Sequence, residues 1–156
     1  MDYRLINARH AIVTYAQTLG FDVVGFSSAK IESKYIDVFK EWLSMERNGT
    51  MSYLNDTNHI EKRCDMAKIL PGAQSVVVVA MNYYRPQAPL KRGYGRIARY
   101  AYGRDYHKII GSKLKKLRRF IIGYGIEHFP EQKMVAAKSF VDAGPLLERA
   151  LAAQGG

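Results

Sequence analysis

The chain has 156 residues, 47% of them apolar, and a formal net charge of +10. This apolar fraction can build one folded domain with a buried core and excludes wholesale disorder. The single cysteine, Cys64, excludes an internal disulfide and any site made of several thiolates within these residues. The start of the chain has no signal-peptide pattern, and the longest strongly apolar run, residues 76–81, is far shorter than the about 20 residues that span a bilayer. We therefore expect a soluble, cytoplasmic protein with no membrane partner.

The positive charge is concentrated in residues 85–119. This segment holds twelve Lys or Arg and one acid, Asp105, so its net charge is +11, whereas the rest of the chain sums to −1. A basic segment of this size is typical of a face that binds a polyanion such as RNA. The alternative is a solvated, Lys-rich helix that binds nothing. The tyrosines that favour the first interpretation are Tyr94, Tyr100, Tyr102 and Tyr106.

The first half of the chain predicts helices around one short strand. Apolar residues recur at helical spacing over residues 3–19, and Gly20 fits the position just past a helix end. The β-rich run FDVVGF predicts a strand at residues 21–26. Further helices are expected at residues 36–47 and 59–70, with one helical turn at residues 51–54.

The second half begins with the clearest strand, SVVVVAMNYY at residues 75–84. A continuous apolar run of this kind is typical of a central strand covered on both faces. Residues 85–95 contain two prolines and two glycines and predict a loop. Asp105 is a candidate N-cap for a helix that ends near residue 122. The cations expected on its outer face are Lys113, Lys115, Lys116, Arg118 and Arg119. After this helix we expect a turn at residues 123–130, a strand at residues 134–141 and a helix from residue 146.

These predicted elements do not alternate as a regular series of strand, helix and strand. An α+β fold, with helices packed on a small sheet, fits them best. Because the chain stops at residues 154–156, soon after its last predicted helix begins, we interpret it as a fragment of a longer protein.

Three blocks of sequence occur in a fixed order: ILPGAQSVVVVAMNYY at residues 69–84, IARYAYGRDYHK at residues 97–108 and FVDAGPLLERALA at residues 140–152. Together they resemble the epoxyqueuosine reductase family. The resemblance implies a cobalamin-dependent, iron–sulfur oxidoreductase of queuosine biosynthesis, which reduces epoxyqueuosine to queuosine at the wobble position of tRNA. It further implies a nitroreductase-like, reductive-dehalogenase-like cobalamin-binding α/β sandwich. Residues 1–156 would form this N-terminal cobalamin-binding domain, in incomplete form.

In that family the chain continues with two ferredoxin-like cysteine groups that hold four-iron, four-sulfur clusters. Cys64 alone cannot hold such a cluster. The resemblance therefore implies that the clusters lie beyond residue 156, that an external donor supplies electrons, and that this chain is inactive alone. It also implies tRNA, through its anticodon arm, as a partner, and we expect a monomer.

The same resemblance implies site residues. Asp142 matches the proton donor to the substrate and lies near the cofactor, although its place before a predicted helix also suits an N-cap. Arg63 matches a cobalamin contact, since the cofactor's amides and phosphate accept hydrogen bonds from a guanidinium, although a solvated helix arginine is the alternative. Ala98 is small enough for the backbone to approach the corrin, or is a core alanine, and Arg99 would bind phosphate of the cofactor or of tRNA.

The remaining expectations concern RNA, metals and alternatives. No two histidines have metal-ligand spacing, so no metal site is predicted. Glu148 and Arg149 are expected to form a structural ion pair. Two other functions stay open: an RNA-binding module without catalysis, in which tyrosines stack on bases, and a cobalamin carrier domain. The cations expected to bind RNA are Arg104, Lys115, Lys116, Arg118 and Arg119.

Overall fold

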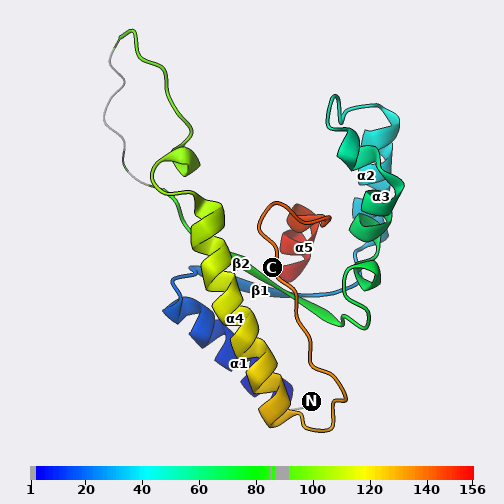
Figure 1. Ribbon diagram of the computed structural model, residues 1–156, viewed down its shortest axis with the longest axis vertical. Helices are drawn as coiled ribbons and strands as arrows, with labels where there is room; N and C mark the ends of the chain where they lie inside the picture. The colour runs from blue at the N-terminus through cyan, green and yellow to red at the C-terminus, as the bar shows by residue number, and fades with distance from the viewer. Residues whose placement is uncertain (1–2, 85, 87–91) are drawn as a thin grey trace. The chain divides into compact units, whose positions relative to one another are not determined.

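The computed structural model describes residues 3–84, 86 and 92–156. It contains helices and two short strands, which confirms the α+β class (Figure 1). The elements are α1 (Tyr3–Thr18), β1 (Val23–Ser28), α2 (Ser33–Ser44), the 3-10 turn η1 (Ser52–Asn55), α3 (Thr57–Cys64), the 3-10 turn η2 (Met66–Lys68), β2 (Ser75–Ala80), the 3-10 turn η3 (Arg99–Ala101), α4 (Tyr106–His128) and α5 (Glu148–Gly155).

The sheet consists of β1 paired with β2. The N–H of Asp22 donates to the carbonyl of Ala80 at 2.9 Å, and the N–H of Ala29 donates to the carbonyl of Gln74 at 3.0 Å. Since the start of one strand meets the end of the other, the pair is antiparallel. The expectation of a central strand at β2 is wrong for the described residues: β2 pairs there with β1 alone, and its four valines are only half-buried.

The chain divides into two compact units. Unit 1 contains Met1–Val23 and Val79–Val141, and unit 2 contains Val24–Val78 and Asp142–Gly156. Each unit therefore combines segments that are far apart in sequence.

Unit 1 is built on the packing of α1 against α4, which lie side by side in Figure 1. The rings of Tyr15 and Phe120 stack with their centroids 4.2 Å apart. Ala16 and Leu117 are buried. The amphipathic pattern predicted for both helices thus gives this pair its apolar contact.

Helix α4 begins where the sequence predicts and ends later. Asp105 caps it, because its Oδ1 accepts from the backbone N–H of His107 at 2.9 Å. The turn expected at residues 123–130 is wrong over most of its length, since the helix continues to His128. The ring of Tyr124 stacks on that of His128 and contacts that of Phe120 at a tilt, and these contacts along one face of the helix favour its continuation despite two glycines.

The strand expected at residues 134–141 is also wrong, because these residues are irregular. A Cβ added to Gly125 of α4 would lie 2.6 Å from Cγ1 of Val135, so this segment runs closely against the helix. Packing against a helix leaves the backbone without the neighbouring strand that a β ladder needs.

Unit 2 contains α2, α3 and α5 with the greater part of the sheet. The helix expected at residues 59–70 is split by Asp65, whose Oδ1 accepts from the N–H of Ala67 at 2.9 Å and so starts η2. Helix α3 itself is capped by Asp56, which accepts from the N–H of His59 at 3.0 Å. The buried apolar side chains of this unit are Ala29, Ile31, Leu43, Ile69, Ala150 and Leu151. Over the described part of the chain, no helix combines the length and the apolar character needed to cross a membrane.

Candidate active site

Asp142 has an unusual backbone conformation. Its φ is 53°, which places a non-glycine residue in the left-handed region. Asp tolerates this region better than most residues, but such conformations are sparsely populated and concentrate at functional sites. The side chain is exposed. Helix α5 begins at Glu148 with Leu147 at its N-cap, so the alternative that Asp142 caps this helix is wrong.

Glu148, the first residue of α5, lies beside Asp142. Burial raises the pKa of the Glu148 carboxyl, and the neighbouring Asp142 carboxyl raises it further. The backbone N–H of Asp142 and the guanidinium of Arg63 act in the opposite direction. Unit 2 therefore brings together Arg63 from α3, Asp142 and Glu148.

Two polar atoms of this cluster are buried without a hydrogen-bond partner among the described residues. They are Nη1 of Arg63 and Oε1 of Glu148. Buried polar groups are nearly always satisfied, so an orphaned guanidinium nitrogen and an orphaned carboxyl oxygen indicate a place where another group binds or a proton resides. The cluster offers a proton donor from its carboxyl groups and a hydrogen-bond donor from Arg63.

The ion pair expected between Glu148 and Arg149 is wrong. Arg149 is exposed and forms no ion pair with Glu148, whose carboxyl instead faces Asp142 and Arg63. Sequence reasoning missed Glu148 as a member of the site. The available signal was its place in the FVDAGPLLERALA block, which already contained Asp142.

Unit 1 carries the other expected site residues. Ala98 is exposed in an extended conformation at the N-cap of η3, so its interpretation as a core alanine is wrong. Arg99 follows it, with its guanidinium carbon 4.4 Å from the centroid of the Tyr84 ring. Tyr106 stacks on His107 with centroids 4.1 Å apart and meets the edge of Tyr100 at 6.1 Å. These residues form an aromatic and cationic surface just before α4.

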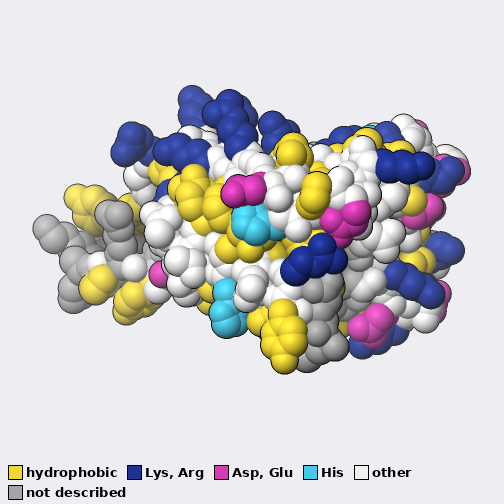
Figure 2. All heavy atoms as spheres, turned by 90° about the horizontal axis from the view of Figure 1, so that it is seen from below, with side chains coloured by type: hydrophobic (Ala, Val, Ile, Leu, Met, Phe, Trp, Pro, Cys, Tyr) yellow, Lys and Arg dark blue, Asp and Glu magenta, His cyan; other side chains and the backbone are white. Residues whose placement is uncertain are grey.

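The basic face of α4 consists of Lys115, Lys116, Arg118 and Arg119. Three of these side chains are exposed and Arg118 is half-buried. None of the four forms an ion pair within the described part of the chain, so their charges remain available. Figure 2 shows Lys and Arg side chains, in dark blue, projecting along the upper edge of that view. Arg104, which precedes the helix, is exposed. The expectation that Lys113 faces outward is wrong, because this side chain is half-buried and its Nζ lies 5.9 Å from the centroid of the Phe21 ring.

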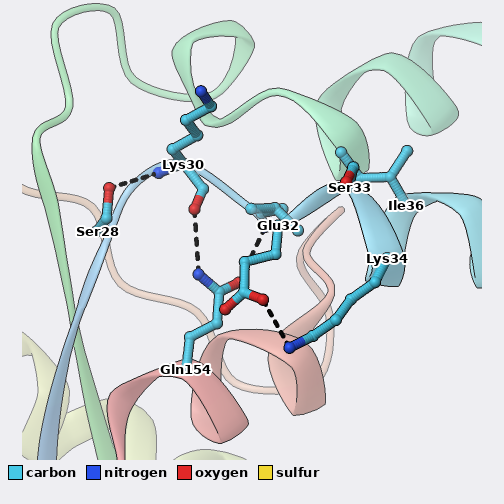
Figure 3. A pocket seen from close by; sticks show the side chains of 8 residues that line it. Ser28, Lys30, Glu32, Ser33, Lys34, Ile36 and Gln154 are labelled. Carbon is cyan, nitrogen blue, oxygen red and sulfur yellow. Dashed lines mark hydrogen bonds and ion pairs between the residues drawn. The ribbon is translucent and has the colours of Figure 1, made fainter.

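A shallow hollow of about 700 Å³ lies between the start of α2 and the end of α5 (Figure 3). Glu32 and Lys34 form an ion pair of 2.6 Å within it. Gln154 donates from Nε2 to the carbonyl of Lys30 at 3.1 Å and accepts at Oε1 from the N–H of Glu32 at 3.3 Å. None of the expected site residues lines this hollow, and the hydrogen bonds of Gln154 across it hold the end of α5. Across the described ranges, no three His, Cys, Asp or Glu residues are grouped so that they could hold a metal ion.

Comparison with known proteins shows which family the chain resembles. The model of the family described as epoxyqueuosine reductase QueG, DUF1730, matches residues 63–143. An epoxyqueuosine reductase of Leadbetterella byssophila is 37% identical over 145 residues, which are 93% of this chain and 45% of that protein.

Two solved structures extend the likeness to the fold. A crystal structure of epoxyqueuosine reductase with an epoxyqueuosine-modified tRNA-Tyr stem loop is 26% identical with a TM-score of 0.78, over 97% of this chain and 38% of that one. A Bacillus subtilis epoxyqueuosine reductase, with its catalytic loop swung out of the active site, is 26% identical with a TM-score of 0.74 over the same shares.

The α+β fold of this chain is thus the one found in solved epoxyqueuosine reductases. Since the family match spans more than half of its residues, the chain belongs to the epoxyqueuosine reductase QueG family, DUF1730, which confirms the resemblance seen in the sequence. The chain spans less than half the length of the curated relatives that it matches.

Proposed function

We propose that this chain is the N-terminal, cobalamin-binding portion of an epoxyqueuosine reductase, which reduces epoxyqueuosine to queuosine at the wobble position of tRNA. The observation that carries the proposal is the cluster of Arg63, Asp142 and Glu148 in unit 2, with Asp142 in a left-handed conformation. The solved Bacillus subtilis relative has a catalytic loop that is swung out of its active site. Asp142 lies in an irregular segment before α5, which is suited to serve as such a loop.

The residues present fit cobalamin. The buried Nη1 of Arg63 lacks an acceptor among the described residues, and the cofactor's amide and phosphate oxygens are acceptors of the kind that a guanidinium binds. Within unit 1, taken by itself, Ala98 is exposed and presents only a methyl group, which permits close approach of a ligand, and Arg99 follows it with a cation for phosphate. Cobalamin, when bound, supplies a reduced cobalt centre as the source of electrons for the epoxide. In this proposal residues 1–156 form a nitroreductase-like sandwich, and the four-iron, four-sulfur clusters lie elsewhere in the full-length protein.

Asp142 is the proposed proton donor. Conversion of an epoxide to an alkene takes up electrons and protons and releases the oxygen as water. The departing oxygen is a poor leaving group until it is protonated, so a positioned carboxyl group accelerates the reaction as a general acid. The exposed Asp142 side chain can reach a substrate, while Glu148 behind it is partly buried.

The proposed macromolecular partner is the tRNA anticodon arm. Support comes from the uncompensated cations of α4 and from the solved relative that holds a tRNA stem loop. Arg104 and the exposed Tyr94, Tyr100 and Tyr102 add charge and stacking surface next to the helix. The full-length protein would act as a cytoplasmic monomer with an external electron donor.

Cobalamin titration of the full-length protein that contains this chain, followed by absorbance, tests the proposal. We expect saturable binding that Arg63→Met weakens. The control variant Lys62→Met, which removes a neighbouring cation of the same helix, should change the binding little. Binding together with reduction of epoxyqueuosine-tRNA supports the enzyme. Binding without reduction would support the cobalamin carrier instead. RNA binding without cobalamin binding would support the non-catalytic RNA-binding module, which the exposed tyrosines favour.

A further inference from the structure

Helix α5 gives Glu148 a fixed position. Ala150 and Leu151 are buried to 8% and 2% exposure. At the far end of the helix, the backbone of Gly155 contacts Gly25 of β1, and Gln154 bonds to the backbone of the segment after β1. A helix anchored along its length holds its first side chain in one place, so the position of Glu148 beside Asp142 is a property of the fold.

The surroundings of Glu148 favour a neutral carboxyl group. Its Oε1 is buried without a hydrogen-bond partner in the described residues, and a charged oxygen in that position would be poorly solvated. Two groups act on it electrostatically: the Asp142 carboxyl, which disfavours a second negative charge, and the Arg63 guanidinium of α3, which favours one. Burial and Asp142 together raise the pKa of Glu148, so of these two carboxyls Glu148 is the one whose surroundings favour keeping a proton.

Resting on the proposed function, we propose that Glu148 is a positioning residue that stores the catalytic proton and passes it to Asp142. In the resting pair the proton is bonded to Glu148 and hydrogen-bonded to Asp142. As the epoxide oxygen departs, the O–H bond of Glu148 breaks and an O–H bond forms on Asp142, and the Asp142 proton is then transferred to that oxygen. Glu148 is left as a carboxylate near the Arg63 guanidinium until water returns a proton to it. No electrons move in these steps.

This inference predicts distinct behaviour for the two carboxyl groups. Asp142 touches the substrate, so its loss removes the general acid and lowers the rate by about 10²–10⁴-fold. Glu148 acts through Asp142, so Glu148→Gln leaves Asp142 able to take protons directly from water, more slowly. A purely structural role for Glu148 would change stability without changing how the rate depends on pH.

The first test needs no turnover. The chain is labelled with ¹³C at its glutamate carboxyls, and each resonance is followed by NMR as the pH is raised. The Glu148 resonance is identified as the one that is missing from the spectrum of Glu148→Gln. Its pKa should lie above the ordinary value of 4.5, and Asp142→Asn should lower this pKa toward that value. A Glu148 resonance that titrates with the exposed glutamates, or that ignores Asp142→Asn, would overturn the inference.

The second test is single-turnover reduction by the full-length protein as a function of pH. Glu148→Gln should lower the rate by about 10-fold or more. It should also abolish the fall in rate that the wild type shows as rising pH deprotonates Glu148. Glu127→Gln, which changes an exposed carboxyl of α4, should leave the profile intact. If the wild type turns over, Asp142→Asn fails and Glu148→Gln matches the wild type, the proton store is refuted and the proposed function stands. If the wild type does not turn over, both are refuted.

Discussion

The backbone of Gly25 in β1 lies directly against that of Gly155 in α5, so that a Cβ on Gly25 would lie 2.8 Å from the carbonyl oxygen of Gly155. Backbone atoms cannot move aside as the end of a flexible side chain can. Only glycine at position 25 allows this approach, which seats α5 on the sheet and fixes Glu148 beside Asp142.

Replacing Gly25 with alanine should therefore destabilise unit 2. The added methyl group overpacks a backbone contact, which costs about 1–3 kcal/mol of unfolding free energy. Chemical denaturation measures this directly. The matched control is Gly123→Ala on α4, where a Cβ meets open space and alanine favours the helix by about 0.5–1 kcal/mol. Equal stability of the two variants would refute the contact.

Glu148→Gln should stabilise the chain at neutral pH. The pKa of Glu148 is raised in the folded protein above 4.5, so its contribution to stability is complete below that value and is lost as the pH rises through the folded pKa. Glutamine does not titrate and escapes this loss. Melting temperatures of the two forms should coincide near about pH 4 and diverge toward about pH 7. A melting temperature of Glu148→Gln below that of the wild type at neutral pH would show that the fold stabilises Glu148 as an anion.

Asp105→Ala should destabilise α4. Asp105 accepts hydrogen bonds from the backbone and side chain of His107, and these bonds lower the pKa of its carboxyl from the ordinary 3.8. Its stabilising contribution is therefore present above that value and is lost as the pH falls through the lowered pKa. Thermal melts should show a deficit for Asp105→Ala at neutral pH that shrinks in acid, while Asp105→Asn keeps most of the cap. A deficit that is independent of pH would contradict this account.

Charge reversal on the basic face of α4 should weaken RNA binding and its dependence on salt. Each lost phosphate contact lowers the slope of log affinity against log salt by about 0.7–0.9, so the reversal of Lys115, Lys116, Arg118 and Arg119 to Glu should lower it by up to about 3.6. Filter binding to a tRNA anticodon stem loop across a salt series gives both slopes. An unchanged slope would exclude this face as the RNA surface. The control reverses an equal number of exposed cations elsewhere: Lys30, Lys40, Arg47 and Lys133.

The parts of the fold that sequence predicted correctly are those with local physical signals. Asp105 before an amphipathic run predicted the start of α4, and the valine run of residues 75–84 predicted β2. The failures involve contacts between distant segments. Nothing local shows that Val135 packs on Gly125, or that stacked rings carry α4 past its glycines, so the turn at residues 123–130 and the strand at residues 134–141 were both wrong.

The residues of the candidate site were likewise only partly predictable from the sequence. Asp142 and Arg63 were found through the resemblance of short blocks, and no local rule would have selected them. Glu148 was interpreted as a partner of its neighbour Arg149, because sequence alone favours nearby ion pairs. The fold turns it instead toward Asp142 and toward Arg63 of α3, an approach that depends on the anchoring of α5 far from the site.

The most direct test of the central claim is single-turnover reduction of epoxyqueuosine-tRNA by the Asp142→Asn full-length protein, with its melting temperature measured in parallel. Asn tolerates the left-handed backbone at this position and resembles Asp in shape, but it has no carboxyl proton to transfer. Loss of a positioned general acid typically lowers the rate by about 10²–10⁴-fold. We predict a loss of this size with an unchanged melting temperature and unchanged cobalamin and tRNA affinities. Turnover at the wild-type rate would contradict the role of Asp142 and with it the proposed active site.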